Sequence, residues 1–245
     1  MHSPQLNMLL ASLPEPDYER LAPHLELVGL SSGAEIFHSG KPYTGIYFPT
    51  TCTVSAQVEL EAGVSTDIYL LGHRGLFGTG TPQRGSFYKA IVRKPGFAYR
   101  CPTHILTQEL LRAEGVLLMS LMATRIMMEE MAKNIACRTI HTASQQIARW
   151  LMNYGQCKPV DTIAITHNEL ANALGIRRER VTLVLNQFEA QGCIRLNRGH
   201  IHIHDHASLS QLSCTCDQEH ALNKIWTQAY LVPTTELTAK LKAMS

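Results

Sequence analysis

One short segment in the C-terminal half constrains the fold most, because it specifies two helices joined by a tight turn. Thr166 and Glu169 have the spacing of a capping box, in which a hydroxyl and a carboxylate satisfy N–H groups at a helix start. Gly175 suits the left-handed conformation that a tight interhelical turn requires. A second helix is expected from about Arg177 to Gln191, and Gly192 stands where a glycine commonly ends a helix. This pattern predicts a helix-turn-helix.

The apolar residues of this segment support the same prediction. Ala171 is small enough to let two helices approach closely, and Val181 is placed to fill the angle between them. Ile176 is expected as a buried turn residue. The expected inner face of the second helix is completed by Val184, Leu185 and Phe188.

The outer face of the second helix carries side chains that suit contacts with base edges. Arg donates paired hydrogen bonds to guanine, Glu accepts from cytosine, and Thr contacts the methyl group of thymine. Helix-turn-helix proteins make such contacts near the N-terminus of this helix. The alternative is an αα-hairpin with a solvated Arg/Glu face. The candidate residues are Arg177, Arg178, Glu179, Arg180 and Thr182.

A β-hairpin is expected directly after the second helix. Residues 193–196 and 200–204 alternate between apolar and polar side chains, and Asn197-Arg198-Gly199 joins them as a turn. A hairpin in this place makes the motif a winged helix-turn-helix. The wing would bring Arg195 and Arg198 towards phosphates, and His200 near its turn is a further phosphate contact.

The region from residue 26 to residue 102 consists of short apolar stretches separated by Gly and Pro turns, after one or two short helices in residues 6–30. Such spacing is typical of an all-β sandwich or barrel. The expected strands are 25–30, 34–38, 45–48, 54–60, 66–71, 89–93 and 98–101.

A long helix without proline or glycine is expected from Val116 to Ile140. One apolar stripe advances in alternating steps of four and three residues, which is the pattern of a coiled-coil seam. A second apolar face means that the helix must be covered on both sides, by the β domain and by a second copy of itself. A fully buried core helix of a monomer is the alternative. The predicted dimer seam is Leu117, Leu121, Thr124, Met128, Met131 and Ile135.

Composition excludes several classes of protein without selecting a function. The 245 residues carry a net charge of only +2, so any basic surface must be local. No apolar run is long enough for a membrane span, and no signal peptide is visible. The seven cysteines do not form a disulfide framework, which favours reduced thiols and a cytoplasmic location.

These pieces together resemble the Crp/Fnr family of bacterial transcription regulators over nearly the whole chain. Residues 166–182 are similar to the family's DNA-binding signature, residues 198–205 to its wing, and Gly45–Pro49 with Gly72–Gly78 to its β-roll. The resemblance adds Thr166 and His167 to the expected DNA-binding residues.

The family's architecture implies an α+β fold with three parts. They are an N-terminal antiparallel β-roll sensor domain of the cyclic-nucleotide-binding type at 1–112, a long dimerisation helix at 113–140, and a winged helix-turn-helix domain with a tail at 141–245. The resemblance implies a homodimer on a pseudo-palindromic DNA operator, with one half-site per subunit. It also implies RNA polymerase as a partner and no enzymatic activity.

The nucleotide site of the family is degenerate in this sequence. Cyclic-AMP-binding members carry a Gly-Glu pair where Gly78-Thr79 stands here, and an Arg-Ser/Thr pair near Tyr88-Lys89. Lys89 is offset from the lost Arg and lacks its bidentate fork. Met131 and Ala132 replace the purine-contacting hydroxyls of the long helix. We therefore expect no ordinary cyclic-nucleotide site and no cofactor.

Other family features also differ. The first cysteine is Cys52, so the N-terminal iron–sulfur cluster of Fnr-type members is absent. Leu183 stands where cyclic-AMP responders carry a further Arg, so a different operator sequence is expected.

Two patterns of histidine and cysteine residues are candidate metal sites, but no metal is expected at either. His200, His202, His204 and His206 alternate as on one strand face, where a solvated wing with Ile201 and Ile203 turned inwards is the alternative. Cys214, Cys216 and His220 offer at most three ligands, whereas structural zinc takes four. Ordinary thiols in a surface helix are the simpler interpretation.

The competing hypothesis for function is a ligand-binding module. In that case the β-roll binds a nucleotide or small molecule, and the C-terminal domain binds protein rather than DNA. An enzyme is less favoured, because no nucleophile or acid–base pair has a supporting local signature. The sequence assigns no role to residues 221–245.

Overall fold

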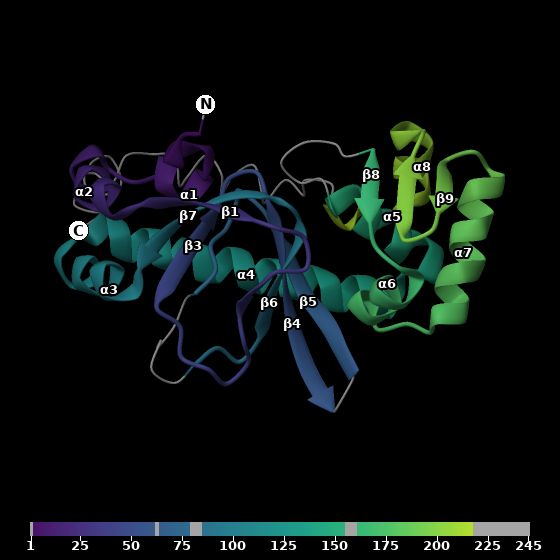
Figure 1. The fold of residues 1–245 in the computed structure, drawn as a ribbon, viewed down its shortest axis with the longest axis horizontal. Helices are drawn as coiled ribbons and strands as arrows, with labels where there is room; N and C mark the ends of the chain where they lie inside the picture. Colours follow the sequence, from purple (N-terminus) through teal and green to yellow (C-terminus); the bar gives the residue numbers. More distant parts are fainter. Residues whose placement is uncertain (1, 62–63, 79–84, 155–160, 218–245) are drawn as a thin grey trace, which may run out of the picture.

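The computed structural model describes residues 2–61, 64–78, 85–154 and 161–217. The N-terminal strands and short helices lie at one end of the molecule, a second group of helices and strands lies at the other, and the long helix α4 runs between them (Figure 1). Thr79, His220 and the segment 221–245, which the sequence analysis considered, lie outside the described residues.

The N-terminal domain is an antiparallel β-roll, the fold that the resemblance implies, whereas the turn spacing alone predicted a sandwich or barrel of short strands. Its two sheets have the orders β1-β7-β3 and β2-β6-β4-β5. All seven predicted strands are present, with ends that differ by at most a few residues. They are β1 (Glu26–Leu30), β2 (Glu35–Phe37), β3 (Gly45–Pro49), β4 (Thr53–Glu61), β5 (Val64–Leu71), β6 (Lys89–Lys94) and β7 (Gly96–Pro102).

Short helices close one end of this roll. Leu9, Leu10 and Leu21 are fully buried and pack with Ile46 and Phe48 of β3. The burial of these leucines anchors the N-terminal segment to the sheet. The helices are η1 (Pro4–Leu6), α1 (Met8–Ala11), α2 (Glu15–Leu21) and η2 (Ala22–His24).

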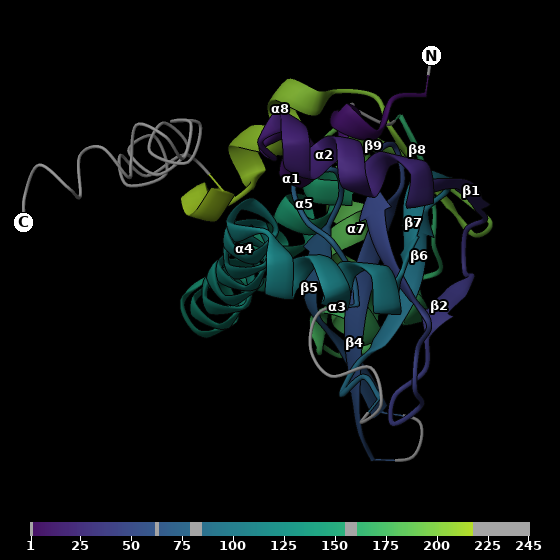
Figure 2. The ribbon, with the colours of Figure 1, turned by 90° about the vertical axis from the view of Figure 1, so that its left-hand side faces the viewer.

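The predicted long helix is present as α4 (Glu114–Ile140), after α3 (Thr103–Arg112). One side of α4 packs on the roll, where Met119 and Ala123 are buried. Met131, which the spacing places on the predicted seam, is partly exposed and also packs against the core of the roll. Figure 2 shows the other flank of α4 facing away from the sheets.

The C-terminal domain has its own core, built around α5, α6 and α7. Ile147, Leu170, Leu185 and Phe188 are buried together with Ile201 of the hairpin. A three-stranded sheet of order β8-β10-β9 covers this core, and its short strand β8 was not predicted. The elements are α5 (Ala143–Tyr154), β8 (Thr162–Ala164), α6 (His167–Leu174), α7 (Arg178–Ala190), β9 (Ile194–Asn197), β10 (His200–Ile203), α8 (His206–Leu212) and η4 (Thr215–Asp217).

Polar contacts connect the C-terminal domain to the roll and to α4. Arg138 of α4 donates to the carbonyl oxygens of Asp67 in β5 and Ala173 in α6. The Thr53 hydroxyl donates to the carbonyl of Tyr154 at 3.1 Å. These bonds join α6 to α4, α4 to β5, and the end of α5 to β4.

The histidine pattern after the wing differs from the sequence prediction. Strand β10 ends at Ile203, so His204 lies beyond it and His206 begins α8. Ile201 and Ile203 are buried, as the solvated-wing alternative predicted. Among the described residues, no helix is both long enough and apolar enough to span a membrane.

Candidate nucleic-acid interface

The turn between α6 and α7 forms as the sequence predicts. The Thr166 hydroxyl accepts from the backbone N–H of Glu169 at 3.2 Å, and the Glu169 carboxylate accepts from the backbone N–H of Thr166 at 2.8 Å. Gly175 ends α6 in the left-handed conformation, with φ of 67°. A side chain at this φ would strain the backbone, so glycine allows α7 to start at once.

Helix α7 separates a buried face from an exposed one. Val181, Val184, Leu185 and Phe188 are buried against α5 and α6, and Arg177 caps the helix. The residues at the start of α7 point outward, because the apolar face holds the opposite side of the helix. Arg177, Arg178, Glu179 and Arg180 are all exposed.

The exposed arginines keep their guanidinium groups available to a ligand. Within the described residues, no ion pair involves Arg177, Arg178, Arg180, Arg195 or Arg198. Arginine without a carboxylate partner on a protein surface suits phosphate or guanine recognition. Exposed arginines of this kind can give a nearly neutral chain a local basic surface.

A groove runs between the N-terminus of α6, the start of α7 and the wing. It is lined by Thr166, His167, Arg178, Arg198 and His200, so half of the predicted DNA-binding residues meet in one place. Asn168 also lines it, which the sequence analysis did not include. An amide at the positive N-terminal end of a helix is well placed to contact a phosphate.

His167 and Thr182 contact each other across this surface. The His167 Nδ1 and the Thr182 hydroxyl are 2.9 Å apart, and Thr182 is half-buried. Thr182 is therefore less free for a base contact than its sequence position predicts. Burial, and to a lesser degree the positive charge of Arg178, lowers the pKa of His167.

The wing places two arginines differently. Arg198 lies in the turn between β9 and β10 and lines the groove, where His200 Nδ1 lies 3.2 Å from the Arg198 carbonyl oxygen. Arg195 lies opposite His202 on the hairpin and is exposed, but it does not line the groove. The other predicted residues outside the groove lie on α7 or at its cap: Arg177, Glu179, Arg180 and Thr182.

Leu183 adds an apolar group to the polar face of α7. It lies one turn after Glu179 and remains 49% exposed. A leucine in this place offers an apolar contact, which suits a thymine methyl group rather than a guanine. From the sequence alone, Leu183 was recognisable only as the absence of an Arg found in cyclic-AMP responders.

The outer flank of α4 exposes most of the predicted seam. Leu117, Leu121, Met128 and Ile135 are 46%, 58%, 60% and 68% exposed. Thr124 lies between them, and its hydroxyl donates to the carbonyl of Ser120 within the helix. A row of exposed apolar side chains over several turns marks an interaction surface.

Aromatic rings fill the interior of the β-roll. The rings of Tyr69 and Phe77 stack at 5.8 Å, and Tyr88 meets both edge-on at 5.9 and 6.4 Å. Phe37 and Tyr43 continue this cluster. Burial raises the pKa of Tyr43 to about 12, which reflects how little water reaches its hydroxyl.

The described positions of the degenerate nucleotide site lie within or around this cluster. Tyr88 is buried, and its hydroxyl bonds to Tyr69 and to the backbone of Gly78. Lys89 pairs with Glu35 at 2.5 Å, and this contact lowers the pKa of Glu35. Met131 packs against the roll, whereas Ala132 is exposed on α4.

Comparison with known proteins agrees with this architecture. Residues 145–212 match the model of a Crp-like helix-turn-helix domain. No curated protein matches the chain by sequence.

Solved structures of the same fold align with this chain over nearly all of their length. A transcriptional regulator of the Crp/Fnr family from Eubacterium rectale ATCC 33656 has a TM-score of 0.67 at 18% identity, over 85% of this chain and 98% of that one. FixK2 from Bradyrhizobium japonicum has a TM-score of 0.64 at 16% identity, over 78% and 98%. The c-di-GMP-responsive global regulator CLP from Xanthomonas campestris has a TM-score of 0.61 at 15% identity, over 78% and 99%.

The helix-turn-helix match covers the surface built by α6, α7 and the wing, and the structural matches extend the likeness to the β-roll and α4. Residues 145–212 thus form a Crp-like helix-turn-helix domain, and the chain as a whole has the fold of solved regulators of the Crp/Fnr family.

Proposed function

We propose that the protein binds a pseudo-palindromic DNA operator as a homodimer and reads its sequence through α7. The observation that carries this proposal is the groove in which Arg178 of α7 and Arg198 of the wing are both exposed and free of ion pairs with described residues. Arg178 and Glu179 lie at the N-terminal end of the second helix, where base contacts are made in this motif.

The proposed contacts divide into reading and positioning. Arg178, Glu179 and Leu183 face outward from α7 and would contact base edges. Arg198 and His200 on the wing, with Thr166 and His167 at the start of α6, would contact phosphates. The phosphate contacts fix the register of α7 without carrying sequence information.

A homodimer paired through the outer flank of α4 completes the proposal. The exposed residues Leu117, Leu121, Met128 and Ile135 follow one flank of α4 with Thr124 between them, and a second copy of the same flank would cover them in a two-fold arrangement. The dimer would present two copies of α7 to two half-sites. This assignment implies a sensor domain at 1–112, a dimerisation helix at 113–140 and a DNA-binding domain at 141–245.

We propose that the effector is not an ordinary cyclic nucleotide bound inside the roll. The rings of Tyr69, Phe77 and Tyr88 occupy the interior, and Lys89 already pairs with Glu35. A cyclic nucleotide would have to displace buried rings that stabilise the core. We further propose action in the cytoplasm together with RNA polymerase, as the likeness to this family implies.

Alanine at Arg178 and Glu179 tests the reading of sequence. Loss of one good bidentate contact costs about 1–3 kcal/mol, so each variant should bind the preferred operator about 5- to 150-fold more weakly than the unchanged protein. Fluorescence anisotropy with operator and scrambled DNA at fixed salt measures the ratio. Binding to scrambled DNA should change little.

Arg112→Ala is the matched control, because Arg112 is an exposed arginine at the end of α3, far from the groove in sequence. Equal affinities of all three variants for operator DNA would contradict the proposal. That result would favour a C-terminal domain that binds protein instead.

A further inference from the structure

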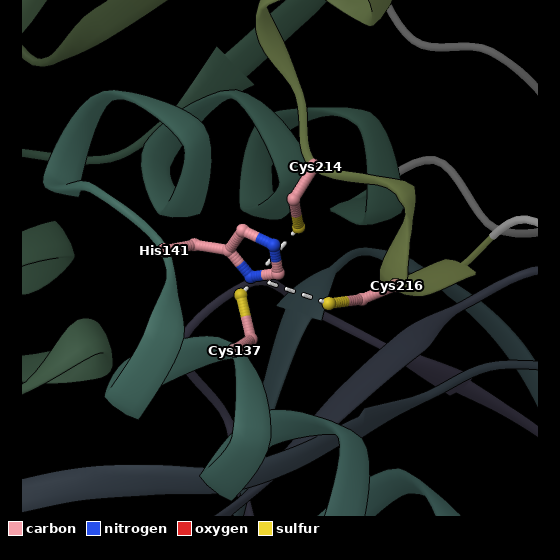
Figure 3. Close-up of side chains that lie close together, drawn as sticks. All are labelled: Cys137, His141, Cys214 and Cys216. Atoms are coloured by element: carbon pink, nitrogen blue, oxygen red, sulfur yellow. Dashed lines mark hydrogen bonds between the residues drawn. The ribbon is translucent and has the colours of Figure 1, made fainter.

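Four metal-ligating side chains from two distant parts of the chain meet at the end of α4 (Figure 3). Cys137 lies in the last turn of α4 and His141 caps the helix, so a spacing of four residues puts both on one face. Cys214 follows α8, and Cys216 lies in η4. Their three Sγ atoms and a ring nitrogen of His141 all lie within 4.8 Å of one another.

Two of the separations between these atoms match those in a tetrahedral metal site, and all of them are at most 4.8 Å. With Zn–S bonds of about 2.3 Å and Zn–N bonds of about 2.0–2.1 Å, ligand sulfurs stand about 3.8 Å apart, and sulfur and nitrogen about 3.5 Å apart. Here the Cys137 and Cys214 Sγ atoms are 3.6 Å apart. The Cys216 Sγ and His141 Nδ1 are 3.5 Å apart.

The surroundings hold the two halves of the cluster together. Arg149 of α5 is buried, and its Nε and Nη2 donate to both carboxylate oxygens of Asp217 at 2.6 and 2.7 Å. Its Nη1 donates to Asn134 of α4 at 2.7 Å. This fork fixes the segment that carries Cys214 and Cys216 against α4 and α5.

The charge of Arg149 also suits an occupied site. Three thiolates and one neutral imidazole around a divalent ion leave a net charge of about −1. The Arg149 guanidinium interacts with Cys137 and lies close enough to influence Cys216. Because Arg149 also pairs with Asp217, its guanidinium offsets only part of the cost of burying the charge of an anionic metal cluster.

The donor set favours a metal over a redox-active thiol pair. A disulfide joins two sulfurs at about 2.0 Å and would leave His141 and Cys216 without a role. Three thiols and one imidazole converging from two segments are the ligands of a structural zinc site, which is closed to solvent ligands. Cys137 and Cys214 are buried, and His141 and Cys216 are half-buried.

We propose that Cys137, His141, Cys214 and Cys216 bind one Zn²⁺ and thereby fasten the end of the C-terminal domain to the end of α4. On binding, three S–H groups lose their protons as three Zn–S bonds form, and neutral His141 coordinates through Nδ1. The ion joins the end of α4 to the segment after α8. It therefore restricts rotation of the helix-turn-helix relative to α4.

This proposal revises the expectation of no metal. The sequence pattern offered Cys214, Cys216 and His220, of which His220 lies outside the described residues. The other two residues of the cluster, Cys137 and His141, lie more than 70 residues earlier in the chain. Cys214 is buried after α8 rather than placed in a surface helix.

The first test measures metal directly in the full-length protein, purified under reducing conditions without a histidine tag or chelator. Elemental analysis should find about one zinc per chain, as one closed tetrahedral site requires. After exchange into Co²⁺, sulfur-to-cobalt charge-transfer bands and strong visible d–d bands should appear, which report tetrahedral thiolate ligation.

Variants assign the ligands. Cys137→Ser and Cys216→Ser should each lose most of the bound zinc and the cobalt spectrum, whereas Cys193→Ala should keep both. Cys193 is a matched control because it is also a buried free cysteine, but it lies away from the cluster before β9. A strong chelator should lower the melting temperature of the unchanged protein and of the control variant.

The cobalt spectrum of the unchanged protein tests the site even where a serine variant fails to fold. Zinc well below one per chain after reconstitution, without tetrahedral cobalt bands, would overturn the proposal. A Cys137–Cys214 disulfide that forms in the reduced buffer would overturn it as well. Loss of zinc from Cys193→Ala to the same extent as from Cys216→Ser would show that the ligands are assigned wrongly.

Discussion

The recognition surface and the interior of the β-roll use their side chains in opposite ways. At the start of α7 and on the wing, Arg178 and Arg198 are exposed and make no ion pair with described residues. Inside the roll, Tyr69 and Tyr88 are buried, and their rings and hydroxyls contact each other.

This difference illustrates that a protein can share a fold with others without sharing their ligand site. Groups that are left free on a surface add little to stability, so their presence in one groove points to a ligand. Aromatic rings packed inside a roll stabilise the roll itself. The β-roll thus shares its fold with solved Crp/Fnr regulators, while its interior is a core of packed aromatic rings, and fold alone does not establish a ligand.

The largest loss of operator binding is expected from variants that prevent the proposed dimer from forming. Leu121→Asp with Met128→Asp would place like charges across the proposed seam of α4 and abolish the dimer. Loss of the second half-site should weaken operator binding about 10²- to 10⁴-fold, because the second contact is no longer intramolecular. Light scattering and anisotropy measure mass and affinity.

The core of the roll should survive this change, since both residues are exposed. Leu111→Asp, an exposed leucine on α3, is the matched control and should remain dimeric. A double variant that stays dimeric at micromolar concentration would contradict the assignment of the α4 flank.

A substitution inside the roll should instead lower the stability of the protein and leave its DNA binding unchanged. Tyr88→Phe removes the buried hydroxyl that bonds to Tyr69 and the Gly78 backbone, at a cost of about 1 kcal/mol in the free energy of unfolding. Denaturant melts measure this loss, and the operator preference should not change.

Millimolar cyclic AMP should leave the melting temperature of the unchanged protein as it is; a clear rise would show that the interior accepts a nucleotide.

Arg198 sharpens the division between reading and positioning. Arg198→Ala should weaken binding to operator DNA and to scrambled DNA by a similar factor. It should also reduce the magnitude of the slope of log affinity against log salt by about 0.9 for each lost phosphate contact. A salt titration of both DNAs measures this. A selective loss of operator binding would instead place Arg198 among the base-reading residues.

The smallest expected effect concerns pH. Burial and Arg178 lower the pKa of His167 below its usual 6.5, so the unfolded chain binds the proton more readily than the folded one. Stability linked to neutral His167 is therefore fully present above about pH 6.5 and declines as pH falls through the lowered pKa of the folded state. Melting temperatures across this range should fall less steeply for His167→Gln than for the unchanged protein; parallel curves would argue against this role.

Features written in local sequence could be predicted. The capping box of Thr166 and Glu169 and the turn at Gly175 depend on neighbouring residues, so their spacing was sufficient. The roll strands followed from their Gly and Pro turns. Strand β8 was missed, because three residues carry too little periodic signal to distinguish a strand from a loop.

Features that depend on distant packing could not be predicted. The a/d spacing placed Met131 on the seam, but it gave no sign that Met131 also contacts the roll. Cys137 and His141 showed no link to Cys214 and Cys216 in sequence, because the contact forms only when α8 and η4 return to α4. The same reason explains why the contact between His167 and Thr182 was not foreseen.

Selection of bound sequences from random duplex DNA tests the central claim most directly. If the exposed start of α7 reads bases in a two-fold dimer, the unchanged protein should enrich a pseudo-palindrome whose half-site centres lie about one helical turn apart. Arg178→Ala and Glu179→Ala should relax the preference at defined positions of each half-site. Selection that enriches no motif, or a motif that both variants leave unaltered, would contradict the account.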